Sequence, residues 1–313
     1  MSGSGFMARS RLIAAFAAVY LIWGSTFLAL ALGLQSIPPL LLMGARSIVA
    51  GAVLLAIEQI RRPGFPTGRA WASASVSGLL LFVGCHGTLA YAQQYVPSGL
   101  AAVMLATVPF WIVLLNVSAP SDPRAKMLTF AGLLPGLVGV ALIAWPDSGA
   151  PAAIDPLMLL LLLASAFFWA AGSLVSQRQQ AATSAISLAG MQLVCGGAAL
   201  LLGGGLSGEL RGFSPGGVSA ISWAGLSYLI GAGSVIGFTA YMWLLDHAPG
   251  PLVATYTFVN PIIAVILGWS FLDERLTPQM LVGTALVVGS VAAVWRLNSR
   301  PAPRDRSALT DQA

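Results

Sequence analysis

Long apolar stretches with almost no charge dominate this chain and restrict it to a membrane. Of its 313 residues, 57% are hydrophobic and 8% are charged, and the apolar stretches recur about ten times. A helix needs about 20 apolar residues to cross roughly 30 Å of hydrocarbon at about 1.5 Å per residue. We therefore expect an all-α integral membrane protein that is embedded in the lipid bilayer and has lipid as a partner.

Glycine and proline punctuation divides the chain into ten expected transmembrane helices. Their expected ranges are 11–34, 38–60, 71–93, 98–117, 125–145, 156–177, 183–202, 218–245, 251–272 and 278–297. Residues 1–10 form an N-terminal tail, in which 1–6 read as a cloning remnant, and residues 298–313 read as a disordered cytoplasmic tail. The spans then fall into two units of five helices, 11–145 and 156–297.

The basic residues predict the orientation of these spans, because cytoplasmic loops are rich in Lys and Arg. With a cytoplasmic N-terminus, the outer side holds only Arg211 and Arg275, and Arg46 lies inside a span. The other twelve basic residues are cytoplasmic: Arg9, Arg11, Arg61, Arg62, Arg69, Arg124, Lys126, Arg178, Arg296, Arg300, Arg304 and Arg306. The formal charge of +5 is thus an orientation signal and does not indicate nucleic-acid binding. We expect a multi-pass protein of a bacterial-type inner membrane with both termini in the cytoplasm.

The two halves of the chain contain a related segment. Residues 97–109 read PSGLAAVMLATVP and residues 249–261 read PGPLVATYTFVNP, with flanking prolines twelve residues apart in both. Because five spans is an odd number, the second half must enter the membrane from the opposite side. The sequence therefore predicts an inverted repeat around a central cavity, which is typical of alternating-access transporters.

Several segments together resemble the EamA family of the drug/metabolite transporter superfamily. They are IWGSTFLAL, PPLLLMGARSIVAG, VPSGLAAVMLATVPFW and YTFVNPIIAVILGWSFLDERLT. Within the superfamily the chain is similar to amino-acid and metabolite exporters of the YddG type. The resemblance implies cytoplasmic termini and a cavity lined by spans one, three, four, six, eight and nine. The chain departs from the family in one place: Asp273-Glu274-Arg275 follows span nine, whereas SAPSDPRAK follows span four.

Polar and aromatic residues within the expected cavity helices are the candidate substrate-binding residues. Helical spacing places His86 and Gln93 on one face of span three, and Tyr256 and Asn260 on one face of span nine. Midspan tryptophans are often packing residues or interface anchors instead. The full set of candidates is Trp23, His86, Gln93, Trp111, Trp169, Tyr241, Tyr256 and Asn260.

Three further residues have separate expected roles. Pro109 and Pro261 free backbone carbonyls inside their helices, so they are candidate hinges. Arg46 lies about eight residues into span two, where a charge costs roughly 2.5–3.5 kcal/mol on insertion scales. We expect a structural buried charge that reaches the interface, pairs with carbonyls or with Asp273–Glu274, or meets a substrate carboxylate. A structural role is favoured because the resemblance implies that span two is peripheral.

The expected function is secondary transport without cofactor, metal or catalysis. All ten acidic residues lie in loops, at helix ends or in the tail, so the intramembrane carboxylates of many antiporters are missing. Transport is then uncoupled or uses His86, because histidine titrates near neutral pH. No Walker, HExxH, GxSxG or CxxC motif occurs.

We expect a monomer or weak dimer that exports amino acids, including aromatic ones, or related metabolites. Drugs, purines or sugars are alternative substrates. A channel and an intramembrane enzyme with His86 as base are the alternatives of another class.

Overall fold

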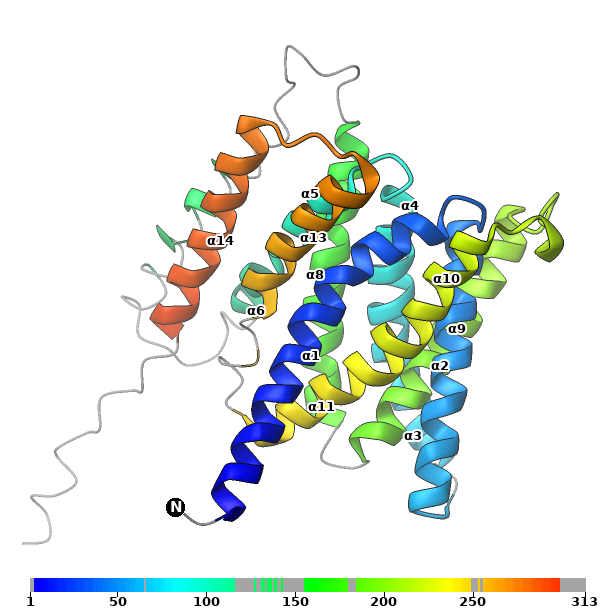
Figure 1. The fold of residues 1–313 in the computed structure, drawn as a ribbon. Helices are drawn as coiled ribbons and strands as arrows, with labels where there is room; N and C mark the ends of the chain where they lie inside the picture. The colour runs from blue at the N-terminus through cyan, green and yellow to red at the C-terminus, as the bar shows by residue number, and fades with distance from the viewer. Residues whose placement is uncertain are drawn as a thin grey trace, which may run out of the picture.

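The computed structural model describes residues 3–64, 66–115, 155–179, 184–248 and 256–298, together with Val253 and scattered positions between 127 and 142. Within these ranges every regular element is helical, and the helices form one bundle (Figure 1). The first half contains α1 (Gly3–Gly33), α2 (Pro39–Arg61), α3 (Gly68–Gly78), η1 (Leu79–Gly87), α4 (Thr88–Ala92), α5 (Ser98–Leu105) and α6 (Val108–Leu115). The second contains α8 (Pro156–Gln179), α9 (Ala185–Ser207), η3 (Pro215–Gly217), α10 (Ala220–Tyr228), η4 (Leu229–Ile236), α11 (Gly237–His247), α13 (Tyr256–Leu272) and α14 (Pro278–Asn298).

Six stretches of the described chain are long and apolar enough to cross a membrane. They are Ser10–Gly33, Pro39–Arg61, Gly68–Ala92, Pro156–Gln179, Ala185–Ser207 and Ala220–Leu244, and three shorter apolar helices cover Ser98–Ile112, Val259–Leu272 and Pro278–Ser290. These stretches match every expected span except 125–145, most of which lies outside the described residues. The all-helical class is confirmed, and the number of ten spans stays a prediction.

Two of the long helices contain a π-helical segment at mid-length. In the third expected span η1 separates α3 from α4, and in the eighth η4 separates α10 from α11. A π-helix has i→i+5 hydrogen bonds and a wider turn than an α-helix, and such segments are frequent at functional sites. Both segments contribute residues to the central cavity described below.

The fourth expected span is divided into two short helices. α5 ends at Leu105, the backbone N–H of Thr107 donates to Met104 O at 3.2 Å, and α6 begins at Val108. Pro109 lacks a backbone N–H and is tolerated in the first turn of a helix, so its position favours a new helix start here. The repeat-related Pro261 lies inside α13, which continues through it.

The most extensive helix packing in the described chain joins α2 to α9, which lie side by side in Figure 1. A Cβ atom on Gly51 would lie 2.9 Å from Gly190 O, and one on Gly197 would lie 3.1 Å from Gly44 O. The early glycine of each helix meets the late glycine of the other, so the helices are antiparallel. Glycines let the two backbones approach closely, and the van der Waals packing that results is one of the forces that drive helix association in a membrane.

Two glutamates tie helix ends together at one face of the bundle. The backbone N–H groups of Leu40 and Leu41, at the start of α2, donate to the carboxylate of Glu209 at 3.2 and 3.0 Å. Those of Ser98 and Gly99, at the start of α5, donate to Glu274 at 2.6 and 3.1 Å. A carboxylate satisfies the free N–H groups of a helix start and complements the helix dipole. We call this face of the bundle the glutamate face; it is the upper face in Figure 1.

Candidate functional site: a cavity at mid-bundle

A cavity of about 100 Å³ lies in the middle of the bundle. Since a water molecule needs about 10–15 Å³ of such volume, the cavity holds several waters or one small solute. The lining residues come from α1, η1, α4, α5, α6, α8, η4, α11 and α13, with Arg46 of α2 and Leu193 of α9. These elements include all six expected cavity spans and add two residues from spans two and seven.

Three aromatic residues gather around Trp23 at one side of this cavity, and we call Trp23, Trp169, Tyr241 and Tyr256 the aromatic cluster. The ring of Trp23 lies 5.8 Å from Trp169, 4.9 Å from Tyr241 and 5.1 Å from Tyr256 between centroids. The Trp169 and Tyr256 contacts are edge-to-face, an arrangement that aromatic quadrupoles favour. The cluster connects α1, α8, α11 and α13.

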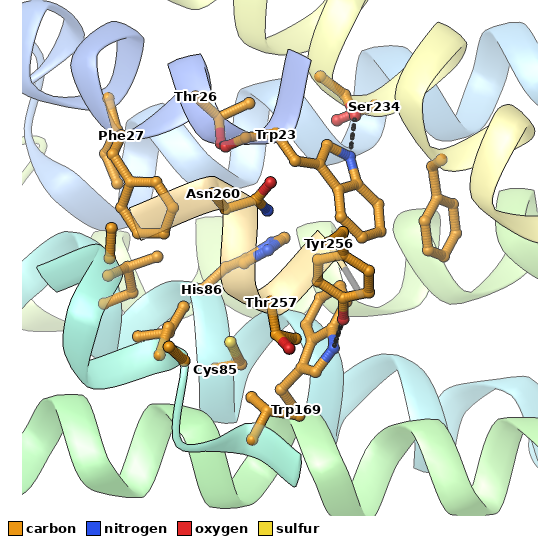
Figure 2. Close-up of a pocket in the computed structure, with 18 of the residues that line it drawn as sticks. Trp23, Thr26, Phe27, Cys85, His86, Trp169, Ser234, Tyr256, Thr257 and Asn260 are labelled. Atoms are coloured by element: carbon orange, nitrogen blue, oxygen red, sulfur yellow. Dashed lines mark hydrogen bonds between the residues drawn. The ribbon is translucent and has the colours of Figure 1, made fainter. Parts of the chain in front are cut away.

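Hydrogen bonds fix the two indoles of the cluster. Trp23 Nε1 donates to Gly233 O at 3.1 Å, and Trp169 Nε1 donates to Tyr256 Oη at 3.3 Å, as Figure 2 shows. Gly237 permits the first contact, because a Cβ atom there would lie 2.7 Å from Trp23 Nε1. The Trp23 ring is therefore held in one place against η4 and α11.

His86 lines the cavity from η1, beside the aromatic cluster. Its ring lies 5.1 Å from Phe82 and 5.6 Å from Trp169 between centroids. Its Nδ1 atom is buried and has no hydrogen-bond partner. Figure 2 places the imidazole in the middle of the pocket next to Asn260. A buried imidazole nitrogen without a partner is costly, and a solute or water in the cavity would satisfy it.

Asn260 and Arg46 add polar groups to the same cavity. In the orientation that satisfies its hydrogen bonds, the Asn260 amide donates to Tyr20 O and Tyr256 O at 3.2 Å each. Arg46 Nε donates to Ser234 Oγ at 2.8 Å. Among the described residues the lining contains no Asp or Glu, and the fixed charge that they contribute is the positive charge of Arg46.

The structure brings together five of the eight predicted binding residues and Arg46. Trp23, His86, Trp169, Tyr256 and Asn260 all line the cavity, and so does the candidate hinge Pro261. Tyr241 is not part of this lining: its ring contacts the Trp23 ring, and it lines a small neighbouring cavity of about 10 Å³. Their functional roles stay predictions.

Gln93 and Trp111 lie outside the lining of the cavity. Gln93 Nε2 donates to Phe27 O at 2.6 Å, so this side chain ties α1 to the end of α4. Trp111 packs edge-to-face on Phe167 of α8 at 5.5 Å between centroids. Residues that the sequence analysis did not single out take part instead, among them Thr26, Phe82 and Ser234. Thr26 and Phe82 lie about one helical turn from the candidates Trp23 and His86, whereas Ser234 lies seven residues from Tyr241 and had no such signal.

Comparison with known proteins identifies the family of this chain and a solved structure of similar fold. A model of the EamA-like transporter family matches residues 10–145 and again 156–296. The chain belongs to this family. The EamA-like fold is also seen in a solved crystal structure of a protein that aligns with a TM-score of 0.64, covering 93% of this chain and 99% of that one at 22% identity.

Curated proteins of similar sequence align with most of this EamA-like chain. The inner-membrane transporter YedA of Escherichia coli K12, itself uncharacterised, is 31% identical over 288 residues that cover 90% of each chain. PecM of Dickeya dadantii is 26% identical, with 87% of this chain and 88% of PecM covered. A chloroplastic WAT1-related protein of Arabidopsis thaliana is 24% identical over 88% of this chain and 67% of its own. This protein is thus a membrane transporter, and its cavity is the candidate substrate site.

Proposed function

We propose that this EamA-like protein exports small metabolites across an inner membrane, and that amino acids, including aromatic ones, are its substrates. The observation that carries the proposal is a cavity in which the aromatic cluster lies beside polar groups of Arg46, His86 and Asn260. Aromatic rings stack on an apolar or aromatic side chain, and an indole face attracts an ammonium group. An amino acid presents these groups within one small molecule.

The proposed mechanism is alternating access between two inverted halves. The family model matches each half once, which supports a duplication. The reciprocal glycine contacts of α2 with α9 also fit a two-fold relation, since Gly44 and Gly190 are each the sixth residue of their helix. The equivalent positions of η1 and η4 fit the same relation. In such a protein the exchange of conformations between the halves opens the cavity to either side.

The hinges of this motion are proposed at Pro109 and Pro261. Pro109 is the second residue of α6, just after the break between α5 and α6, and Pro261 lines the cavity from α13. We place both termini in the cytoplasm, on the distribution of basic residues, and the glutamate face therefore outside. No acidic residue is found in the described part of the lining, which supports exchange that continues without a proton gradient, unless His86 carries the proton.

Counterflow in proteoliposomes with a panel of the twenty amino acids tests the proposal. We expect unlabelled phenylalanine or tryptophan inside the vesicles to drive uptake of the labelled compound. Trp169→Ala should reduce this exchange strongly, whereas Trp223→Ala should not, because Trp223 is a surface residue with 45% exposure. Absence of exchange for every amino acid would refute the substrate assignment, and a drug, purine or sugar panel would then follow. Flux without trans-acceleration would indicate a channel, and chemical conversion an enzyme.

A further inference from the structure

Arg46 is a buried cation without a carboxylate partner among the described residues. It is the eighth residue of α2 and is 7% exposed. Its Nε donates to Ser234 Oγ at 2.8 Å, and its Nη1 has only the weak acceptor Met43 Sδ at 4.0 Å. Arginine stays protonated in proteins, so a full positive charge lies in the cavity wall.

The described glutamates that could neutralise Arg46 are engaged elsewhere. Glu209 caps the start of α2, Glu274 caps the start of α5, and Glu58 accepts a hydrogen bond from Ser184 Oγ at 2.6 Å. A buried charge is normally paired, because leaving water is expensive for an ion. The Nη groups of Arg46 therefore lack a strong hydrogen-bond acceptor unless the cavity contains an anion or ordered water.

The geometry of Arg46 suits a carboxylate as its partner. Because Nε is occupied by Ser234, the donors that remain are on the two Nη atoms of the planar guanidinium. Two parallel N–H groups match the two oxygens of a carboxylate, and such charge-assisted pairs are among the strongest hydrogen bonds. The bond to Ser234 also fixes the plane of the guanidinium, so Ser234 is a positioning residue.

The remaining lining limits the size and polarity of the anion. Leu30, Phe82, Leu89, Leu105 and Leu193 make most of the wall apolar, and the volume is about 100 Å³. A large or multiply charged anion would lose more hydration than one arginine can replace. A compact molecule with one carboxylate and an apolar body fits this combination.

We propose that Arg46 binds the carboxylate of the transported solute, so that the protein selects amphipathic carboxylates over their neutral amides. This inference rests on the proposed function, and it assigns to span two a direct part in substrate recognition. His86 and the aromatic cluster then contact the rest of the solute.

Thermal unfolding of the purified full-length protein with matched ligands tests the inference without transport. The probes are 3-phenylpropionate and 3-phenylpropanamide, which share an apolar body and differ in the carboxylate. We expect the carboxylate to raise the unfolding temperature of the wild type and the amide to have little effect. In Arg46→Gln the concentration of carboxylate for half the effect should rise about 10- to 100-fold, the range for losing hydrogen bonds to a charged group. Arg211→Gln, which changes a loop arginine outside the cavity lining, should behave as wild type.

Arg46→Lys and Ser234→Ala separate binding from folding. Arg46→Lys keeps the positive charge but loses the two parallel N–H donors of the guanidinium, so we expect a smaller loss of carboxylate preference than in Arg46→Gln. Ser234→Ala should weaken carboxylate binding partly and leave the amide unaffected. Equal stabilisation of the wild type by both probes, or by neither, would overturn the inference even if Arg46→Gln failed to fold.

Exchange measurements distinguish this inference from the proposed function. If proteoliposomes exchange phenylalanine but not phenylalaninamide, and Arg46→Gln removes that discrimination, both stand. If phenylalanine exchanges and Arg46→Gln keeps the same discrimination, the inference fails and the proposed function stands. If no amino acid exchanges while 3-phenylpropionate still stabilises the protein through Arg46, the substrate assignment fails and the inference stands.

Discussion

Two antiparallel helix pairs, α2 with α9 and α5 with α13, are alike at the glutamate face and differ near the middle of the bundle. In each pair one helix ends in a residue with left-handed backbone, Gly208 (φ 87°) after α9 and Asp273 (φ 54°) after α13. The next residue, Glu209 or Glu274, caps the start of the partner helix. The same device therefore fastens both pairs at the glutamate face.

Below this shared cap the pairs diverge. α2 and α9 are unbroken helices of 23 residues each, and at the opposite end Ser184 of the α9 N-cap donates to Glu58 of α2. The α5 helix stops at Leu105 beside the cavity, and α13 contains Pro261. From this difference we infer that α2 and α9 form a rigid scaffold, and we propose that α5 and α13 move where they line the cavity.

The largest effect is expected from crowding the α2–α9 scaffold. A Cβ atom on Gly197 would lie 2.8 Å from Ser47 Cβ and 2.9 Å from Ile48 N, whereas one on Gly203 would lie 3.7 Å from its nearest neighbour, Leu40 Cδ1. Gly197→Ala should therefore destabilise the protein by about 1–3 kcal/mol through overpacking. Gly203→Ala on the same helix should be neutral or slightly stabilising. Thermal unfolding and the yield of folded protein measure both, and equal stability of the two variants would contradict a close-packed scaffold.

A smaller and more selective effect is expected from removing the two glutamate caps. Loss of a cap costs about 0.5–2 kcal/mol, so Glu274→Ala and Glu209→Ala should have similar effects on stability. Only Glu274→Ala should favour separation of α5 from α13. The equilibrium constant for this separation should rise about 2- to 30-fold if the whole free energy of the cap acts on it. The measurement is labelling of Ala102→Cys, a cavity position on α5, by an impermeant thiol reagent after Cys85 and Cys195 are replaced by alanine. Faster labelling in both cap variants would mean that the pairs are equally mobile.

The smallest effect on folding is expected from the prolines. Pro261→Ala and Pro109→Ala restore a backbone N–H and remove a bend point, so they should slow exchange without loss of folded protein. Pro39→Ala, in the first turn of the scaffold helix α2, serves as the control and should leave the exchange rate unchanged. Wild-type rates in both hinge variants at equal reconstitution would remove the prolines from the mechanism.

Residues on regular helices were placed well from the sequence, and residues beyond an irregular segment were not. Trp23 and Trp169 lie on the continuous helices α1 and α8, and both line the cavity as the sequence predicted. Gln93 was assigned to the His86 face by a period of 3.6 residues, but it is the C-cap residue of α4, and its amide donates to Phe27 O of α1 instead of lining the cavity. Trp111 follows the break between α5 and α6, which directs it to Phe167.

Arg46 exposes a different limit of sequence reasoning. Its burial within span two was evident from the pattern, and a structural role seemed natural for a peripheral helix. Which neighbour it meets depends on the packing of α2 against η4, which no local pattern in the sequence encodes. The structural role and the proposed carboxylate contact are compatible, since the bond to Ser234 leaves the Nη groups at the cavity.

Paired distance measurements by electron spin resonance test the contrast between scaffold and moving helices most directly. One pair of spin labels replaces Tyr95 and Leu276, exposed residues flanking the capped ends of α5 and α13, and a reference pair replaces Gln35 and Leu206 at the same face beside α2 and α9. In proteoliposomes with an exchanging amino acid on both sides, we predict a second, longer distance for Tyr95–Leu276 and a single unchanged distance for Gln35–Leu206. A longer population in the reference pair, or a single fixed distance in both pairs, would contradict the account.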